Sequence, residues 1–402
     1  MRVDRGTLLA RSVMHSKVSS YQAVKLLEEM RDREKQIIGL MKDLVEVESP
    51  SDNKAAVDRC VDLAAKVCTE IGGRVRRHRQ REFGDLLEAR FGRSRRGRKP
   101  VMLLGHLDTV WPLGTLKQMP FKVEKGRAWG PGTLDMKAGA AMALTAVEYL
   151  LQAKALTRSA VLLLVSDEEI GSTSSRPLTE KLARECEAVY VLEPAQGIAG
   201  AYKTARKGIA GYTIHVTGVA AHSGVDFAHG RSAIAELARQ VDVIQGFTDL
   251  SRGITVNVGT IEGGTRSNVV AAEAWAEVDV RVAKAGDAAR MDKLFRRLHV
   301  FDPGCALRVE GGLNRPPMER TRGTVALFRR AATLAGAMGF ELQEAATGGG
   351  SDGNFTSAIG VPTLDGMGAV GEGAHAVHES VVLKDLAPRT ALLAAMLCEP
   401  EG

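Results

Sequence analysis

"AVLLLVSDEEIGS", residues 160–172, joins six consecutive apolar residues through Ser166 to three consecutive acids. A continuous apolar run of this length is typical of a strand that is buried on both faces of a parallel sheet. Adjacent carboxylates repel one another, and burial raises the cost of their charge further. The stretch therefore predicts an inner strand whose end faces positive charge, supplied by basic side chains or by a metal.

Two further strands of the same character lie nearby in the chain. The run VMLLGHLD (101–108) is apolar until His106, and AVYVL (188–192) ends directly before Glu193. Helices are predicted over Tyr21–Val47, over a segment that ends near Ile71, and over 137–152. Strands that alternate with helices predict an α/β fold built on a mostly parallel, mixed sheet.

The pattern changes near residue 206. GYTIHVTG (211–218) alternates apolar and polar residues with period two, and the elements that follow have the order β-α-β-β-α-β. This order predicts a ferredoxin-like α+β domain, inserted at 206–315 into a discontinuous catalytic domain of 1–205 and 316–402. We expect the insertion to act as a lid and to dimerise by pairing GYTIHVTG, as an edge strand, with its copy.

Composition limits the remaining classes of function. The net charge of +6 arises largely in the basic stretch 74–100, which shows no aromatic interleaving, so we expect an exposed sheet edge and no nucleic-acid partner. Five scattered cysteines without a CxxC pair favour a reducing compartment. The charged N-terminus lacks the apolar core of a signal peptide, and no run approaches a membrane span. We therefore predict a cytoplasmic protein without a membrane partner.

Potential metal ligands follow the predicted strands. Carboxylate and imidazole are the side chains that zinc takes besides thiolate. The carboxyl ends of strands in an open α/β sheet gather at one edge, so loops that follow different strands should meet there. The candidates are His106 and Asp108 in GHLDT, Asp135 in GTLDMKAG, the acids of SDEEIGS, Glu193 in VLEP, and His375 and His378 in HAVHES.

From about residue 35 to the C-terminus, these segments resemble in order the co-catalytic zinc exopeptidase and aminoacylase family. That family includes glutamate carboxypeptidases, which match best, acetylornithine deacetylases and succinyl-diaminopimelate desuccinylases. The resemblance implies two zinc ions per subunit, with cobalt or manganese as possible substitutes. It implies that Asp135 bridges the zincs, that His106 and Glu193 each bind a different zinc, and that Glu169 and His378 complete the two sites. His375 remains the alternative to His378.

The resemblance also assigns the catalytic acids. Glu168 would be the general base that takes a proton from a zinc-activated water and passes it to the leaving nitrogen. Asp108 would orient His106, although capping of a loop is the simpler alternative for that residue. Two metal ions would supply the positive charge that the three acids of SDEEIGS require.

Residues of the inserted domain would contact the substrate. By the resemblance, His222 of GVAAHSG reaches the active site of the other subunit and stabilises the oxyanion, a role suited to an imidazole donor. Arg315 would grip the terminal carboxylate of the substrate. The remaining substrate-binding candidates are Asn268, Arg281, Thr347 and Gly350. Ala201 stands where glutamate-releasing relatives carry a lysine, with Lys203 and Arg206 close by, so the released amino acid stays open.

These expectations together describe a metal-dependent hydrolase. It would cleave the amide bond of N-acyl or peptidyl amino acids that carry a free C-terminal carboxylate. The alternatives are a small-acyl deacylase of the acetylornithine type, an amidohydrolase of carbamoyl compounds, and a dimeric binding protein without catalytic activity. A binding protein without catalytic activity would lack a metal ligand or the general base. In this sequence every candidate position carries a side chain suited to its role.

Overall fold

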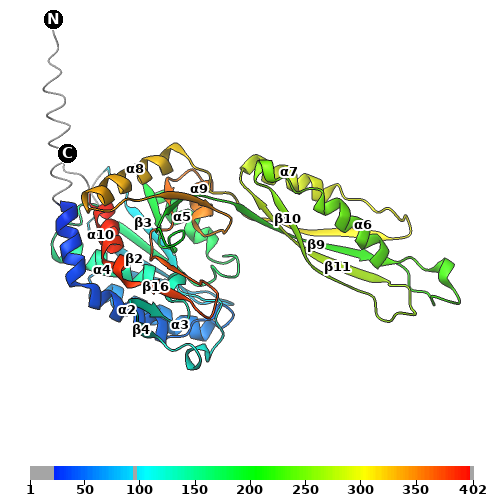
Figure 1. The fold of residues 1–402 in the computed structure, drawn as a ribbon, viewed down its shortest axis with the longest axis horizontal. Coiled ribbons are helices and arrows are strands. Elements are labelled where there is room, and N and C mark those ends of the chain that lie inside the picture. The colour runs from blue at the N-terminus through cyan, green and yellow to red at the C-terminus, as the bar shows by residue number, and fades with distance from the viewer. Residues whose placement is uncertain (1–21, 94–96, 399–402) are drawn as a thin grey trace, which may run out of the picture. The chain divides into compact units, whose positions relative to one another are not determined.

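The chain forms two compact units. A computed structural model describes residues 22–93 and 97–398 (Figure 1). The first unit holds the described residues up to Thr204, Arg320–Ala346 and the described residues from Ser351 onward. The second unit holds Ala205–Glu319 and Thr347–Gly350. The predicted insertion at 206–315 lies inside the second unit.

A six-stranded mixed sheet forms the centre of the first unit, with strand order β1-β2-β6-β3-β7-β14. Its four strands from β6 to β14 run parallel, and β2 and β1 are antiparallel to their neighbours. This arrangement confirms the predicted α/β class. The strands are β1 (Arg74–His78), β2 (Leu86–Phe91), β3 (Val101–His106), β6 (Ala160–Val165), β7 (Ala188–Val191) and β14 (Thr363–Leu364).

Helices cover both faces of this sheet. Leu103 and Leu162 face one hydrophobic cluster, whereas Leu104 and Leu163 face another, as the side-chain alternation of strands requires. Burial on both faces explains why β3 and β6 are apolar at nearly every position. The first cluster contains residues of α2 (Glu34–Glu46), α3 (Lys54–Glu70), α4 (Ala138–Gln152), α8 (Arg322–Ala337) and α10 (Leu386–Leu397). The second contains residues of α5 (Arg176–Glu185), and α9 (Gly353–Ala358) is a further helix of this unit.

The long helix predicted over Tyr21–Val47 is two helices. The described chain is helical over 22–32 and again in α2, with Arg33 between them at φ −96° and ψ 5°. Apolar residues continue at helical spacing on both sides of Arg33, so the pattern alone could not reveal the break. Tyr21 lies outside the described residues.

Two smaller sheets complete the first unit and its connections. One has the strand order β15-β16-β5-β4 and places two chain segments that flank the predicted metal ligands side by side. Its strands are β4 (Lys122–Glu124), β5 (Arg127–Trp129), β15 (Gly371–Glu372) and β16 (Ser380–Val382). The other pairs β8 (Tyr202–Arg206) with β13 (Glu344–Thr347), where the chain crosses between the units.

The second unit has the predicted β-α-β-β-α-β order. Its elements are β9 (Gly208–Thr217), α6 (Ala233–Gln245), β10 (Thr255–Gly263), β11 (Glu273–Val282), α7 (Ala285–Arg296) and β12 (Ala306–Arg315). The strand order is β10-β11-β9-β12, so β9 is an interior strand paired on both sides. The prediction that GYTIHVTG forms a free edge is therefore wrong. The edges are β10 and β12, because β9 uses its backbone groups to pair with β11 and β12.

The loop Thr347–Gly350 was predicted within the catalytic domain, but it groups with the second unit. Arg206 donates through Nη1 to the carbonyl oxygens of Gly349 and Gly350, at 3.2 and 2.9 Å. The Lys207 amide donates to the carbonyl oxygen of Thr347 at 3.0 Å. These hydrogen bonds hold the loop against the start of β9.

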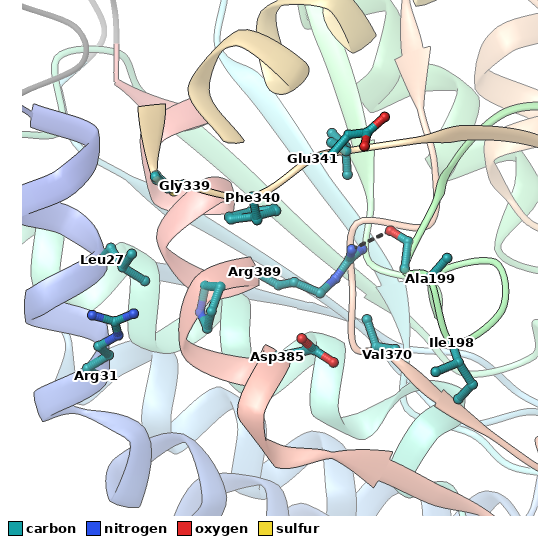
Figure 2. A pocket seen from close by; sticks show the side chains of 14 residues that line it. Leu27, Arg31, Ile198, Ala199, Gly339, Phe340, Glu341, Val370, Asp385 and Arg389 are labelled. Carbon is teal, nitrogen blue, oxygen red and sulfur yellow. Dashed lines mark hydrogen bonds between the residues drawn. The ribbon is translucent and has the colours of Figure 1, made fainter. Parts of the chain in front are cut away.

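A buried arginine ties together two loops of the first unit. Arg389 of α10 donates to the carbonyl oxygens of Gly200, Gly366 and Gly368 at 2.5–2.7 Å, and its guanidinium stacks over Tyr202. Burial lowers the pKa of Arg389. Figure 2 shows Arg389 reaching from α10 to the loop that carries Ile198 and Ala199. These residues line a cavity of about 320 Å³. The arginine thereby fixes the chain as it leaves β14 and approaches β8.

The basic stretch at 74–100 contributes the edge strand β1, as predicted. Several of its charges are paired. Arg77 contacts Asp58 and Asp85, and Arg90 contacts Glu88 and Glu185. Over residues 22–93 and 97–398, none of the helices combines the length and apolar composition needed to cross a bilayer.

Gly139, at the start of α4, provides a test of this packing. A Cβ atom there would lie 2.1 Å from the carbonyl oxygen of Leu192, a backbone atom that cannot move without shifting the end of β7. We expect Gly139→Ala to destabilise the protein by about 1–3 kcal/mol through overpacking. The measurement is the urea midpoint followed by circular dichroism.

Gly336→Ala is the matched control. Gly336 lies in α8, with no atom within 4 Å of the added Cβ. Alanine should therefore raise stability by roughly 0.5–1 kcal/mol, because glycine is the poorer helix former. Equal midpoints for the two variants would contradict the close contact at Gly139.

Candidate metal centre

Three neighbouring parallel strands bring the predicted ligands together. His106 is the last residue of β3 and is 1% exposed. Glu168 and Glu169 follow β6, and Glu193 follows β7. Since β3 lies between β6 and β7, these side chains converge at one edge of the sheet.

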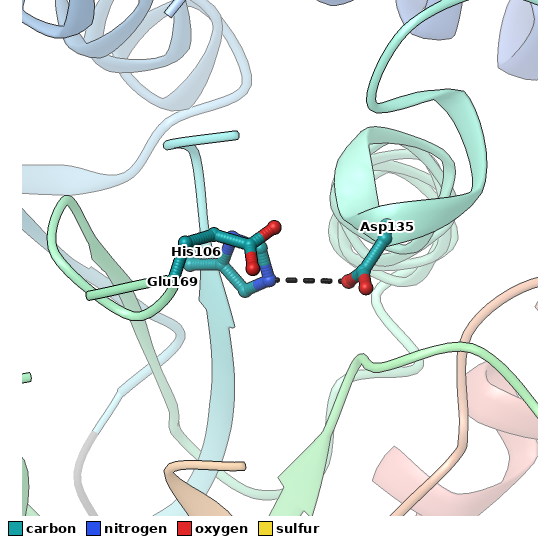
Figure 3. A group of neighbouring side chains, drawn as sticks. All are labelled: His106, Asp135 and Glu169. Atoms are coloured by element: carbon teal, nitrogen blue, oxygen red, sulfur yellow. Dashed lines mark hydrogen bonds and ion pairs between the residues drawn. The ribbon is translucent and has the colours of Figure 1, made fainter. Parts of the chain in front are cut away.

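Asp135 joins this group from a different part of the first unit, a turn between β5 and α4. Its Oδ1 lies 3.3 Å from Nε2 of His106, and its Oδ2 lies 3.4 Å from Nε2 of His375. Figure 3 shows Asp135 facing His106 from the chain that leads into α4. The two oxygens of one carboxylate thus face two different imidazoles.

Each imidazole has a second carboxylate beside it. Nε2 of His106 lies 3.6 Å from Oε1 of Glu193, and Nε2 of His375 lies 3.2 Å from Oε2 of Glu169. The resemblance had placed His106 and Glu193 on different zincs, whereas the structure puts them side by side. The reason is topological: β3 and β7 are adjacent strands, so the residues at their ends are neighbours.

The histidine that reaches the acids is His375, not His378 as predicted. His375 has φ +63°, a left-handed conformation that is uncommon outside glycine and that turns its side chain toward Asp135 and Glu169. The ring of His378 packs against Gly373 instead. The two histidines are three residues apart, so one turn of irregular chain decides which of them faces the site.

The site has strong electrostatic coupling. Burial alone would lower the pKa of His106, but Asp108, Asp135 and Glu193 raise it well above its usual value. Contacts with Asp135 and Glu169 raise the pKa of His375 to about 10. Both shifts have the same cause, which is the presence of carboxylates beside the imidazoles.

The carboxylates respond to the same environment. Burial raises the pKa of Glu169, whose carboxylate has one neighbour of the same charge in Asp135. Burial would also raise the pKa of Asp135, but His106 and His375 hold it well below its usual range. The cluster therefore favours added positive charge, which either protons or a metal ion can supply.

The donor set fits a divalent metal ion. Ligand atoms of His106, Asp135 and Glu169 all lie within 4.8 Å of one another, and those of His106, Glu168 and Glu193 form a second such group. Oε1 of Glu169 is buried and lacks a hydrogen-bond partner among the described residues. A buried carboxylate oxygen without a donor is costly, and metal coordination would satisfy it.

Asp108 lies beneath the ligands and is fully buried. Its carboxylate accepts the backbone amides of Glu168 and Glu169 at 3.3 and 3.2 Å, and the hydroxyl of Ser51 at 2.7 Å. Its Oδ1 lies 3.5 Å from Nδ1 of His106. Asp108 therefore connects the loop after β6 with the imidazole at the end of β3.

Glu379 is a residue of this region that the sequence analysis did not select. It is 1% exposed, and its carboxylate accepts four hydrogen bonds. The donors are the backbone amides of Gly132, Leu134 and Asp135 and the indole Nε1 of Trp111, all at 2.8–3.0 Å. Its position directly before the apolar strand β16 was the only signal, since a charged residue there must find donors.

In the second unit, the two predicted substrate-binding arginines lie together at the start of β9. Arg281 of β11 and Arg315 of β12 both pair with Ile209. Arg315 is 3% exposed, and its side chain lies against Gly350, where an added Cβ would be 2.8 Å from Cδ of Arg315. Arg281 donates to Asp279 at 2.8 Å and reaches the carbonyl oxygen of Gly348 at 3.4 Å.

His222 and Asn268 form another group within the same unit. His222 bridges to Val269, and the Ser223 amide donates to the carbonyl oxygen of Asn268 at 3.0 Å. Nδ1 of His222 accepts the backbone amides of Gly224 and Val225 at 3.1 and 3.2 Å. Because Nδ1 acts as an acceptor, the neutral ring carries its proton on Nε2 and presents a donor to solvent.

These two groups lie at opposite ends of the sheet. Ile209 and Thr217 are eight residue steps apart along β9, which corresponds to about 27 Å of extended strand. After Thr217 the chain continues to pair with the segment that precedes β11. The Val270 amide donates to the carbonyl oxygen of Ala221, and His222 bridges to Val269, so His222 lies beyond Thr217. One copy of the second unit therefore cannot bring Arg315 and His222 to the same small substrate.

Comparison with known proteins places the chain in a family. A family model described as Peptidase family M20/M25/M40 matches residues 102–399. Carboxypeptidase G2 of Pseudomonas sp. (strain RS-16) is 27% identical over 381 residues, covering 92% of this chain and 91% of that protein.

Solved structures have the same fold. The aminopeptidase PepT of Bacillus cereus has a TM-score of 0.73 at 23% identity, covering 90% of this chain and 98% of that one. An M20 family metallo-carboxypeptidase of Sulfolobus solfataricus has a TM-score of 0.72 at 17% identity, with the same coverage. The family match confirms the resemblance described above. The chain therefore belongs to peptidase family M20/M25/M40 and is a metallopeptidase.

Proposed function

We propose that this protein hydrolyses the amide bond of N-acyl or peptidyl amino acids that carry a free C-terminal carboxylate. The main support for the proposal is that the potential ligands form two groups, one on each oxygen of Asp135. One oxygen of Asp135 faces His106 with Glu193, and the other faces His375 with Glu169. Two imidazole–carboxylate pairs that share one carboxylate suit a pair of metal ions with a common ligand.

In this proposal, His106, Asp135 and Glu193 hold one zinc ion, and Asp135, Glu169 and His375 hold the other. The ions, when bound, supply Lewis acidity and a water of lowered pKa. His375 replaces His378 in the assignment because it is the imidazole within reach of Asp135 and Glu169. Asp108 fixes the ring of His106 and the backbone of the two glutamates.

Glu168 is the proposed general base. Its backbone amide donates to Asp108, and its carboxylate lies within 4.8 Å of ligand atoms of His106 and Glu193. The carboxylate takes one proton from the attacking water and returns it to the amide nitrogen as the C–N bond breaks. The products are the carboxylic acid of the acyl part and the free amine of the released amino acid.

Arg315 and Arg281 are the proposed partners of the substrate's terminal carboxylate. Arg315 is buried beside Gly350, whose lack of a side chain leaves room for its stem. A planar guanidinium can bind a carboxylate through two parallel hydrogen bonds. The similarity to carboxypeptidase G2 supports release of a C-terminal residue. Thr347 and Asn268 remain proposed substrate contacts.

His222 is proposed to donate its Nε2 proton to the oxyanion of the tetrahedral intermediate. The carbonyl that is attacked and the carboxylate of the released residue are only about 4 Å apart in a substrate. Since His222 and Arg315 lie at opposite ends of one sheet, they can serve one substrate only if they come from two chains. We therefore propose a homodimer formed through the second unit, in which His222 acts on the partner's substrate.

The proposed reaction predicts a requirement for the free carboxylate. A panel of N-acyl and peptidyl amino acids should be hydrolysed in zinc buffer, whereas the matched C-terminal amides should react at least 100-fold more slowly. The physical reason is that the amide removes the charge that a guanidinium binds. Chromatographic detection of the released amine measures both rates. Preferential cleavage of peptides at a free N-terminus would contradict the proposal.

Glu168→Gln serves as the control for metal-dependent background hydrolysis. It should lower kcat by about 10²–10⁴-fold through loss of the base, while zinc content stays unchanged. Glu124→Gln alters an exposed ion pair and should leave the rate as it is. Near-normal turnover by Glu168→Gln would show that Glu168 is not the general base.

Two histidine variants distinguish the metal ligands. His375→Ala should lower bound zinc from about two equivalents per chain to about one, because one site loses its imidazole. His378→Ala should keep both, since its ring packs on Gly373. Elemental analysis after dialysis measures the content. Loss of zinc from His378→Ala, with full occupancy in His375→Ala, would restore the assignment drawn from the sequence.

Mixed dimers test the role of His222. His222→Ala and Glu168→Gln should each be nearly inactive alone. After subunit exchange, half of the mixed dimer's sites would combine Glu168 of one chain with His222 of the other. Activity should then return to as much as half of the parent value per dimer. Exchange confirmed by mass without any recovery would show that His222 does not act across chains.

A further inference from the structure

Glu379 connects three segments that surround the candidate metal centre. Its Oε1 accepts the backbone amides of Leu134 and Asp135, and its Oε2 accepts the Gly132 amide and the Trp111 indole. Glu379 itself begins the short segment that enters β16, four residues after His375. One side chain thus joins the segment of His375, the turn of Asp135 and the loop after Asp108.

A carboxylate is the side chain that suits this position. A carboxylate has about four lone-pair sites and no proton to donate, and here four N–H groups approach it. Taking a carboxylate out of water is costly unless donors stabilise its charge, and the four N–H groups around Glu379 do so. An amide of the same shape would turn its NH₂ group toward two of the N–H donors and lose their hydrogen bonds.

The strand pairing around Glu379 makes its position rigid. β16 pairs with β5, and β5 leads within a few residues into the turn that holds Asp135. The Gly130 amide also approaches the carbonyl oxygen of Glu379. Backbone and side chain of Glu379 therefore both act on the segment 130–135, while the carboxylate of Asp135 points the other way, to His106 and His375.

We propose that Glu379 is a positioning residue for the metal centre, which fixes the turn 132–135 so that Asp135 presents one oxygen to each histidine group. This inference rests on the proposed function, because it assumes that Asp135 shares two metal ions. Glu379 itself does not touch the metal in this proposal. It acts through the backbone amide of Asp135, the residue on which both halves of the site depend.

Zinc affinity tests the proposal without reference to catalysis. The metal-free parent, Glu379→Gln and Glu48→Gln are titrated with zinc in competition with a chelating dye. Glu379→Gln should bind zinc about 10–100-fold more weakly, the usual effect of removing a group that orients a ligand. As zinc is raised to saturation, its kcat should return to within about threefold of the parent, because Glu379 does not touch the reacting atoms.

Glu48→Gln is the matched control. Glu48 also accepts two backbone amides, those of Gly114 and Leu116 at 2.8 and 2.9 Å, but it holds a loop without a predicted metal ligand. Its zinc affinity should stay within about threefold of the parent value. Urea midpoints of the metal-free proteins show how much each variant loses in stability alone. An equal fall in affinity for both variants would assign Glu379 a structural role only.

The outcomes separate this inference from the proposed function. A parent that binds no zinc would contradict the proposed function itself. A parent that binds zinc and a folded Glu379→Gln variant of unchanged affinity would overturn the inference alone. If Glu379→Gln does not fold, Trp111→Phe removes one of the four donors and should weaken zinc binding by about two- to tenfold; unchanged affinity there would overturn the inference.

Discussion

The candidate metal centre of the first unit depends on one carboxylate, that of Asp135, which lies between two imidazoles. Asp135 can face His106 with one oxygen and His375 with the other only if its turn and both histidine segments are held in place. Around this pair of contacts the carboxylates outnumber the imidazoles, so the site is short of positive charge. The carboxylates beside His106 and His375 raise the pKa values of both imidazoles for the same reason.

Acids that bind backbone amides provide much of this rigidity. Asp108 holds the amides of Glu168 and Glu169, Asp167 those of Ser174 and Ser175, and Glu379 three amides of the Asp135 turn. Each is a buried carboxylate that accepts hydrogen bonds from at least two main-chain amides. These buried carboxylates therefore hold the backbone of the loops in place, and the potential ligand side chains on those loops lie close to one another.

The sequence predicted the parts of this arrangement that follow from strand burial. Apolar runs ending in polar residues located β3, β6 and β7, and with them His106, the acids after β6 and Glu193. The same patterns could not separate His375 from His378, because the choice depends on one left-handed residue in an irregular turn. They also misplaced β9, since an interior strand with one open face alternates in the same way as an edge strand. Glu379 was missed because its partners are backbone amides, which leave no trace in the sequence.

The order of the segments along the chain has a consequence for biosynthesis. His106, Asp135, Glu169 and Glu193 precede Ala205, whereas His375 and Glu379 follow the whole of the second unit. The second unit is nearly continuous and can form its own hydrophobic core as soon as Glu319 has been added. A nascent chain that has reached this point already carries one imidazole–carboxylate pair, but it lacks the other imidazole and the residue that holds the Asp135 turn. The complete candidate metal centre therefore cannot form before His375 and Glu379 have been synthesised, and a product truncated before His375 contains at most half of it.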